Sequence, residues 1–417
     1  MLNTEDSLLL AATSLADDII ENRRRAPDGS LTWLGPRSPW RGASSLAGES
    51  PKMVQIGPHL YSGVLGVSIF LAALARTLGD PYYEAECLHT VSSLRQRLDE
   101  IVNDPQRAEK IRFGVGGLTG LGSFIYSFVT IGKLLNVPHL IREAHEISVL
   151  ITPERIAADR VLDITTGGAG MILALLALDH ELPEPNRNGM TPIEIAGLCA
   201  MHLLDRHLPG EDGLKTWKTL PDFPPLAGFA HGTAGICCAL LQLYGRTGRQ
   251  ELWEAAQTGL AFERRAYLPE HKNWRDLRFQ DGQFMNGWCH GAPGIMLGRL
   301  ATLDVAEGEE IRAEISSGLE TTGDPSLGSF DHVCCGNMGR ADALVYAYHK
   351  LREPSLLESA REISRRVLER KEQTTGRFRW MLGGDFDPAF FSGAAGIGYS
   401  LLRVAQVEDL PCILIME

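Results

Sequence analysis

The sequence lacks any apolar run that approaches the ~20 residues of a membrane-spanning helix. Its first residues, MLNTEDSLLLAATSLADD, carry acids where a secretory signal carries basic residues, so no signal peptide is indicated. Positive charge is also in deficit, because the formal net charge is -12. This deficit argues against broad binding to nucleic-acid phosphates. We therefore expect a cytoplasmic protein with no membrane span and no nucleic-acid partner.

Cysteine is sparse, with 8 residues in 417. Without a secretion signal, free thiols, metal ligands or a nucleophile are favoured over disulfides. Glycine is abundant by contrast, at 44 residues, well above the ~7% of an average protein. Apolar residues at 44% and charged residues at 22% predict a sizeable buried core.

The glycines recur periodically, since a G-x-x-G tetrapeptide begins each of seven apolar segments. The first glycines of these tetrapeptides are Gly63, Gly117, Gly167, Gly232, Gly291, Gly336 and Gly393. The segments that follow, such as 63–80 and 393–406, are apolar around most of the helical circumference, which is typical of buried helices. Intervening stretches such as 355–373 place charges at helical spacing and suit a solvated layer. Each repeat is therefore predicted to be a pair of one inner and one outer helix.

Seven helix pairs either extend as an open solenoid or close into a ring. We expect closure, because the last repeat is as apolar as the middle ones and offers no polar capping face. The predicted fold is all-α, a double-layered α,α-toroid of seven helical hairpins. We expect a single domain, 1–417, with an N-terminal helix and loop over 1–51 and the toroid over 52–417.

Aligning the repeats on the first glycine brings reactive side chains into one register. The two residues before the glycine are Ala230-His231, Cys289-His290 and Cys334-Cys335 in three consecutive repeats. In a closed ring these positions converge on the mouth of the central cavity. Three cysteines there can supply the protein ligands of a catalytic zinc site and leave its fourth position open. The predicted ligands are Cys289, Cys334 and Cys335. The alternative is that such cysteines are simply buried free thiols. We interpret the other five cysteines in this way, as core or surface residues: Cys87, Cys199, Cys237, Cys238 and Cys412.

Histidines and carboxylates near this register are candidates for proton transfer. His231 is a fourth ligand, a general acid/base or a packed histidine, and its place in the cavity favours the acid/base role. Asp163, four residues before its glycine, either caps a helix or faces His231 and orients the imidazole. His290 either touches the substrate or lies behind the ligands. Asp331 and His332 are further candidates of the same kind.

The segments WCHGAPG and CCGNMG, together with LTWLGP, DITTGGAG, GFAHGTAGI and the closing LPCILIME, resemble a known family over essentially the whole chain. It is the lanthionine synthetase cyclases (LanC) and the C-terminal cyclase domain of the class II synthetases (LanM). The resemblance implies an α,α-toroid with one Zn²⁺ held by Cys289, Cys334 and Cys335, and Asp163 and His231 as the acid/base pair. It implies an enzyme that adds peptide cysteine to dehydroalanine or dehydrobutyrine, forming thioether rings. The partners implied are a dehydrated precursor peptide and a dehydratase domain or protein.

The sequence departs from the family at two positions. The Cys334-Cys335 pair stands where stand-alone cyclases usually have Cys-His, and is the pattern of a subset of class II enzymes. Met285 stands where an arginine is usual, four residues before the first zinc cysteine. Two other functions remain open. A LanC-like scaffold that binds peptide or glutathione would use zinc to activate a thiol for another acceptor, or for structure alone. A toroidal glycosidase or lyase would need paired carboxylates across the cavity, where the aligned register offers only Asp163.

Overall fold

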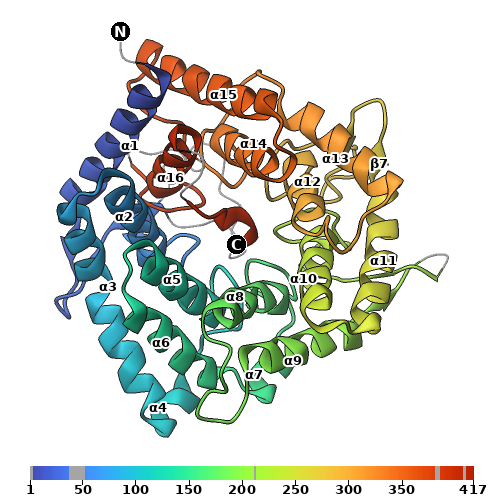
Figure 1. Ribbon diagram of the computed structural model, residues 1–417, viewed down its shortest axis with the longest axis horizontal. Coiled ribbons are helices and arrows are strands. Elements are labelled where there is room, and N and C mark those ends of the chain that lie inside the picture. The colour runs from blue at the N-terminus through green and yellow to red at the C-terminus, as the bar shows by residue number, and fades with distance from the viewer. Residues whose placement is uncertain (1–2, 37–51, 211–212, 381–385, 407–409) are drawn as a thin grey trace.

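The computed structural model describes residues 3–36, 52–210, 213–380, 386–406 and 410–417. Residues 37–51, which form most of the predicted N-terminal loop, lie outside the described residues. The helices of the described segments form two concentric layers that close into a ring (Figure 1). The predicted double-layered α,α-toroid is confirmed.

Seven helices of the described chain form the inner layer (Figure 1). They are α2 (Val64–Leu78), α5 (Leu121–Leu134), α8 (Gly168–Glu181), α10 (Thr233–Thr247), α12 (Ala292–Ala301), α14 (Asn337–Leu351) and α16 (Ala394–Ala405). These helices are buried on nearly every side, and in α5 every residue except Lys133 is buried. Their apolar composition is therefore explained by position, because both the outer layer and the ring centre cover them.

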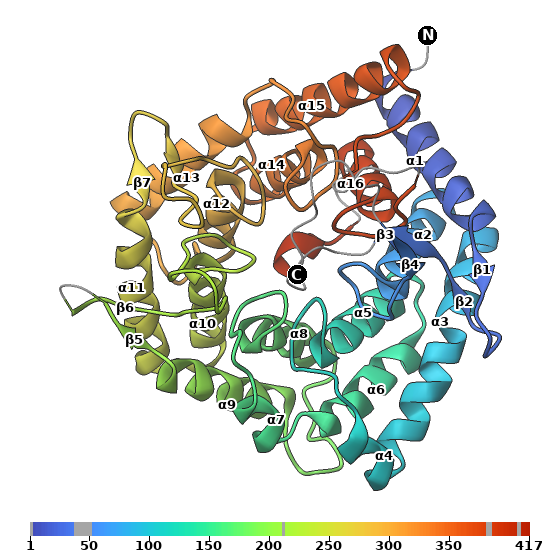
Figure 2. The same ribbon diagram turned by 180° about the vertical axis from the view of Figure 1, so that it is seen from behind.

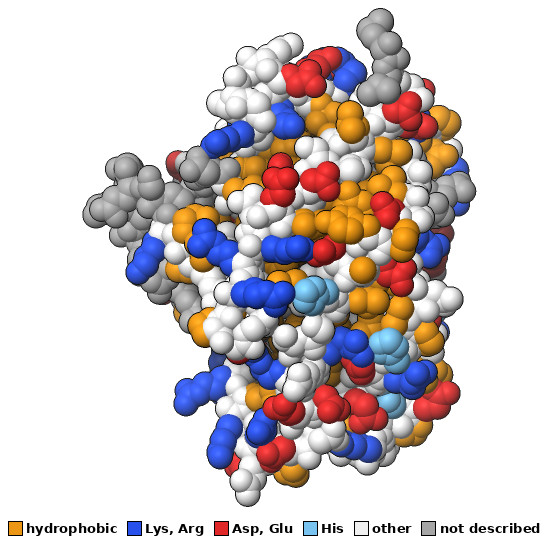
Figure 3. All heavy atoms as spheres, turned by 90° about the vertical axis from the view of Figure 1, so that its left-hand side faces the viewer, with side chains coloured by type: hydrophobic (Ala, Val, Ile, Leu, Met, Phe, Trp, Pro, Cys, Tyr) orange, Lys and Arg blue, Asp and Glu red, His pale blue; other side chains and the backbone are white. Residues whose placement is uncertain are grey.

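The outer layer holds the amphipathic helices, again seven within the described residues. They are α1 (Thr4–Glu21), α3 (Pro81–Val102), α6 (Pro138–Ile147), α9 (Pro192–Asp205), α11 (Gln250–Arg264), α13 (Glu309–Thr322) and α15 (Pro354–Gln373). Local sequence sets their starts: Asp80 caps α3 by accepting from the Tyr82 N–H at 2.9 Å, and Thr191 with Glu194 forms a capping box on α9. Charged side chains of both signs are scattered over the outer wall (Figure 3).

The last inner helix obtains its outer partner from the other end of the chain. Each of the other inner helices packs against the outer helix that follows it, whereas α16 packs against α1 (Figure 1). The buried face of α1 includes Leu8, Ala12, Leu15 and Ile19. The segment 1–51, which we set apart from the toroid, thereby contributes an outer helix to it. The seventh predicted pair joins the two ends of the sequence and closes the ring.

Short elements connect the layers. They are the helices α4 (Pro105–Lys110) and α7 (Pro153–Ala157), the 3-10 helices η1 (Ser148–Leu150) and η3 (Ile413–Ile415), and the antiparallel strand pairs β1 (Arg24–Arg25) with β2 (Leu31–Thr32), β3 (Leu34–Pro36) with β4 (Met53–Gln55), β5 (Leu208–Pro209) with β6 (Lys215–Thr216) and β7 (Tyr267–Leu268) with β8 (Asn273–Trp274). The pairs formed by β1 to β6 are seen best from behind (Figure 2). Among the described helices, none combines the length and apolarity that crossing a bilayer requires.

A circle of hydrogen bonds joins the loops that lead into the inner helices. The residue two places before each N-cap glycine contacts the carbonyl of its counterpart in the next repeat, through its backbone N–H in all cases but one. The members are Tyr61, Leu118, Thr165, Ala230, Cys289, Cys334 and Phe391, and the backbone N···O distances lie between 3.0 and 3.3 Å. Between Thr165 and Ala230 the Thr165 hydroxyl donates, at 3.4 Å. The Phe391 N–H donates to the Tyr61 carbonyl at 3.0 Å and completes the circle.

The circle corrects the alignment of the second repeat. Helix α5 begins after Gly120, not after Gly117, so the predicted register of this repeat is wrong by three residues. The segment GVGGLTGLG offers several glycines, and spacing alone selected the earlier one. Gly117 has another role, because it packs against Gly170 of the neighbouring repeat, where an added Cβ would lie 2.6 Å from the Gly170 Cα. Close approach of two backbones requires glycine there.

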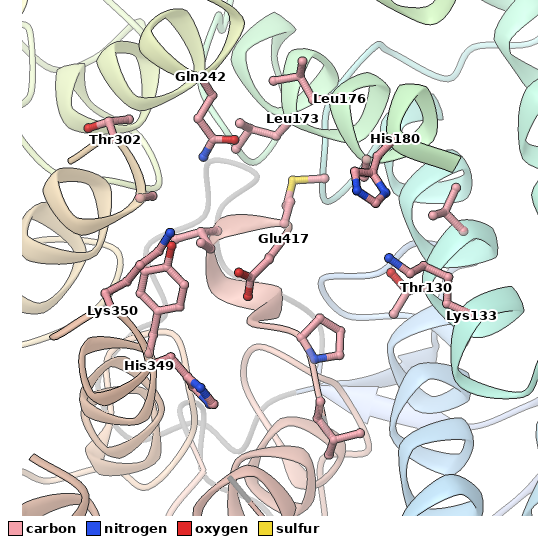
Figure 4. Close-up of a pocket in the computed structure, with 18 of the residues that line it drawn as sticks. Thr130, Lys133, Leu173, Leu176, His180, Gln242, Thr302, His349, Lys350 and Glu417 are labelled. Atoms are coloured by element: carbon pink, nitrogen blue, oxygen red, sulfur yellow. The ribbon is translucent and has the colours of Figure 1, made fainter. Parts of the chain in front are cut away.

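A cavity of about 880 Å³ lies at the opposite end of the ring, among the C-terminal ends of the inner helices (Figure 4). Lys133, His180, His349 and Lys350 contribute to its lining, together with the C-terminal segment that contains Glu417. Basic side chains at helix C-termini complement the negative end of the helix dipole. The reactive side chains identified from the sequence precede the N-termini of these helices, so they lie away from this cavity.

Candidate metal centre

The circle of hydrogen bonds brings two cysteine loops from neighbouring repeats together. The Cys289 N–H donates to the Cys334 carbonyl at 3.1 Å, and Cys335 follows directly. The sulfurs of Cys289, Cys334 and Cys335 all lie within 4.8 Å of one another. Gly287 packs against the second loop so closely that an added Cβ would lie 2.8 Å from the Cys335 Cα. The structure thus unites the three cysteines that the sequence alignment placed in one register.

The three sulfurs suit a zinc ion. A tetrahedral site with Zn–S bonds of about 2.3 Å separates two sulfurs by roughly 3.8 Å, which small side-chain shifts reach from the observed cluster. Hydrogen bonds from the Cys289 and Cys334 thiols lower the pKa of Cys335, whereas the same network and burial raise the pKa of Cys334. One thiolate shared among three sulfurs is a natural starting point for binding a soft cation. In the part of the chain that the structure describes, this group of candidate ligands contains the three sulfurs alone.

Aromatic side chains support the cysteine loops. The Tyr61 hydroxyl donates to the Cys334 Sγ at 3.2 Å, and its ring stacks on Phe391 with centroids 4.8 Å apart. His332 Nδ1 lies 3.2 Å from the Phe391 carbonyl, which can only accept, so Nδ1 carries the proton. His332 Nε2 then faces the Cys335 Sγ at 3.7 Å. These contacts hold the two cysteine loops in place, and two of the residues that make them, Tyr61 and Phe391, come from the repeats at which the ring closes.

Asp331, a candidate from the sequence, belongs to a separate network. It accepts from the Arg379 N–H at 2.9 Å and from the Asn337 side chain at 3.0 Å, and it pairs with Arg370. Asp331 therefore fixes the segment before the paired cysteines and does not orient His332 in the way that Asp163 orients His231.

Asp163 and His231 meet across two repeats. His231 Nδ1 lies 2.7 Å from Asp163 Oδ2, and Asp163 Oδ1 accepts from the Thr166 N–H at 2.7 Å. Asp163 therefore closes the turn before α8 and holds the imidazole; it does not cap the helix, because the N-cap of α8 is Gly167. Burial lowers the pKa of His231, but the Asp163 charge and hydrogen bond outweigh it, so the pKa is raised overall.

His231 stands in the loop next to the cysteines. The Ala230 N–H, one residue earlier, donates to the Cys289 carbonyl at 3.3 Å. His290 lies between the two loops, with its ring centroid 6.2 Å from that of His231 and its Nδ1 4.0 Å from Asp276. Burial lowers the pKa of His290 to about 4, so this histidine is neutral at physiological pH.

Sequence reasoning missed Arg278 and Asp276, which form the wall next to His290. Arg278 Nε lies 2.9 Å from Asp276 Oδ1, and Arg278 Nη2 lies 2.6 Å from Asp276 Oδ2. Both residues follow β8, outside the register that the glycines align, so the repeats gave no signal for them. Tyr61 stood in the register but was given no role, because its contact with Cys334 depends on ring closure.

The remaining cysteines belong to the core. The five are Cys87, Cys199, Cys237, Cys238 and Cys412, and each is buried and forms no disulfide. Burial raises the pKa of Cys87, whose thiol donates to the Ser68 carbonyl at 3.2 Å. Such thiols are poor nucleophiles. The sequence left open whether these five lie in the core or at the surface, and the structure places all five in the core.

Comparison with known proteins identifies the fold in which this site is set. A sequence model of the family described as "Lanthionine synthetase C-like protein" matches residues 55–415. The solved structure of nisin cyclase superposes with a TM-score of 0.56 at 15% identity, covering 86% of this chain and 92% of that one. A GH76 α-mannanase from Bacteroides thetaiotaomicron superposes with a TM-score of 0.51 at 9% identity, covering 96% and 95%. At such low identities the two structures show a shared α,α-toroid, whereas the family match covers most of the sequence.

Proposed function

Because this chain belongs to the lanthionine synthetase C-like family, we propose that it is a zinc-dependent cyclase of dehydrated peptides. Its reaction is the addition of peptide cysteine thiols to dehydroalanine or dehydrobutyrine, which a separate or fused dehydratase supplies. The observation that carries the proposal is the cluster of three sulfurs within 4.8 Å of one another, set beside the His231–Asp163 pair. The Cys334-Cys335 pair favours kinship with the cyclase domains of class II synthetases.

The three cysteines would hold the zinc and leave one coordination position to the substrate. Bound zinc lowers the pKa of a coordinated thiol, which is about 8.5 when free, and so supplies thiolate at neutral pH. The Tyr61 hydroxyl, 3.2 Å from the Cys334 Sγ, fixes the direction in which this sulfur points. Such outer contacts keep a ligand set in place while a guest sulfur enters and leaves.

His231 completes the addition by proton transfer. As the sulfur–Cβ bond forms, the electron pair of the Cα=Cβ double bond moves onto Cα and the adjacent carbonyl, and Cα must then gain a proton. Protonated His231 gives this proton from Nε2, while Asp163 keeps Nδ1–H in place at 2.7 Å. The raised pKa of His231, which the Asp163 charge and hydrogen bond cause against the effect of burial, favours the protonated imidazole that this step requires.

A hollow next to the second cysteine loop offers room for the peptide. It has a volume of about 560 Å³ and is lined by Phe330, Phe378 and Trp380, with Arg377 and Arg379 at its margin. Phe330 is 37% exposed and lies four residues before Cys334. Phe378 and Trp380 are buried, so the Phe330 ring is the exposed apolar surface that an apolar residue of the peptide could contact.

The direct test is incubation with a dehydrated peptide that contains cysteine. We expect zinc at one ion per chain and loss of free peptide thiol without a change in peptide mass. Cys289→Ala should lose both the zinc and the reaction. Cys238→Ala is the matched control, because it removes a buried thiol that lies outside the cluster and should retain both. A wild-type protein without zinc would refute the proposal, and a zinc protein that activates thiols without closing rings would favour the scaffold function.

The third cysteine ligand has a consequence for reactivity. Three thiolates crowd more negative charge around the guest sulfur than two thiolates and a histidine do. We propose that the site is therefore more reactive and less dependent on peptide sequence than a Cys-Cys-His site. Cys335→His, assayed for cyclisation on several dehydrated peptides, should react more slowly and with greater selectivity, and unchanged rates would contradict this reasoning.

A further inference from the structure

A positive charge stands next to the three-cysteine centre. We propose that Arg278, anchored by Asp276, stabilises the thiolate of an incoming substrate at this centre. The inference rests on the proposed function and deepens it, by naming the residue that offsets the negative charge of the ligand set.

The guanidinium group is held rigidly. Two of its contacts with Asp276 are short, with Nε···Oδ1 at 2.9 Å and Nη2···Oδ2 at 2.6 Å, and the side chains of Arg278 and Asp276 are 9% and 1% exposed. The Asp276 N–H donates to the Gln283 carbonyl at 2.9 Å, which fixes the loop that carries the pair. A two-pronged arginine–carboxylate contact of this kind sets the orientation as well as the position of the charge.

The guanidinium group of Arg278 lies near the three sulfurs, with the side chain of Met285 between them. Arg278 Nη2 lies 4.0 Å from the Met285 Sδ, which in turn lies 3.8 Å from the Cys289 Sγ. These two contacts in series keep the cation within roughly 8 Å of the cluster, a range over which charges interact strongly inside a protein.

The charges around the cluster show why a cation is needed. Three thiolates around a divalent ion leave one net negative charge. A substrate thiolate as the fourth ligand adds a second net negative charge in a largely buried site. The two basic groups near the cluster are each paired with a carboxylate, His231 with Asp163 and Arg278 with Asp276. Of the two, Arg278 has a chain of contacts to the cluster, because its guanidinium lies against Met285 and Met285 lies against the Cys289 sulfur.

The size of the effect follows from distance and burial. A unit charge at roughly 8 Å in an effective dielectric of about 20 changes a binding equilibrium by about 30-fold. Asp276 contacts the same Nη2 that lies against Met285, and its negative charge offsets part of this effect. We therefore expect removal of the Arg278 charge to weaken thiol binding by about tenfold.

Thiol binding can be measured without any acceptor. The cobalt-substituted protein is titrated with N-acetylcysteine amide at pH 7, and binding is followed through the sulfur-to-cobalt absorption. Arg278→Gln should bind this thiol about tenfold more weakly than wild type, and Arg278→Lys, which keeps the charge, should stay within about threefold. Arg275→Gln is the control, because it removes the same charge from an exposed position three residues earlier and should bind as wild type.

Two results would overturn the inference: wild-type thiol affinity in Arg278→Gln, or an affinity in Arg278→Lys as low as that of the glutamine variant. Cobalt content and circular dichroism are measured for every variant. If the glutamine variant does not hold cobalt, Arg278→Met, which fills a similar space against Met285, takes its place. A third result would separate this inference from the proposed function. If thiol binding depends on Arg278 but the wild-type protein closes no rings, the proposed function is wrong and this inference holds.

Discussion

The close approach of Gly287 to Cys335 makes a sharp prediction about metal binding. In Gly287→Ala the new Cβ would lie 2.8 Å from the Cys335 Cα and 3.0 Å from its Cβ. Ordinary carbon–carbon contacts are about 3.5 Å or longer, so the Cys335 backbone must move by roughly 0.7 Å. Zinc–sulfur distances tolerate only about 0.2 Å, so the displaced sulfur no longer fits a shared ion well. We expect zinc affinity to fall by at least about tenfold, or ~1.4 kcal/mol.

The assay is competition for zinc against a chromophoric chelator, with thermal unfolding recorded in parallel. Gly197→Ala serves as the control, because this glycine lies within outer helix α9 and its new methyl group would meet only the flexible end of Arg249, at 3.4 Å. That variant should bind zinc as wild type does and be slightly more stable. Wild-type zinc affinity in a folded Gly287→Ala protein would show that Cys335 is not a ligand or that its loop yields freely.

Three further predictions address the surroundings of the centre. Asp163→Asn should lower the pKa of His231, and because protonated His231 donates the proton, the alkaline decline of the cyclisation rate should move to lower pH; a pH–rate profile measures this. Tyr61→Phe removes the donor to the Cys334 sulfur and should reduce zinc affinity by about tenfold in chelator competition, without loss of fold. Trp288→Phe leaves a buried carbonyl of the C-terminal segment without its indole donor and should cost ~1–3 kcal/mol in urea unfolding.

The repeated glycines predicted most of the fold, because six of the seven first glycines are the N-caps of buried helices and so fix a register. That register is physical: the residue two places before the N-cap glycine makes the circle of hydrogen bonds. Cys289 and Cys334 could be paired from the sequence for this reason. The predicted register of the second repeat is wrong because this segment contains several glycines with different roles. Gly117 allows close packing of two backbones, whereas Gly120 is the N-cap of α5.

What escaped prediction comes from contacts that cross the ring or leave the register. Tyr61 and Cys334 are separated by 273 residues, and only closure brings them to 3.2 Å. Arg278 lies near the sulfurs across Met285, on the segment that follows β8 and outside the glycine register. Helix α1 lacks the glycine signature altogether, so its role as the outer partner of α16 could not be read from the repeats.

The pairing of α1 with α16 has a consequence for how the protein is made. A ribosome delivers α1 first and α16 last, so the apolar face of α1 must wait for nearly the whole chain before it is covered. The loops of Cys289 and Cys334 can meet earlier, since they come from adjacent repeats, but Phe391 and Tyr61 reach them only when the two ends join. Stable loading of a metal ion should therefore follow the synthesis of α16, and a nascent chain stalled before residue 391 should release zinc far more readily than a chain that includes this helix.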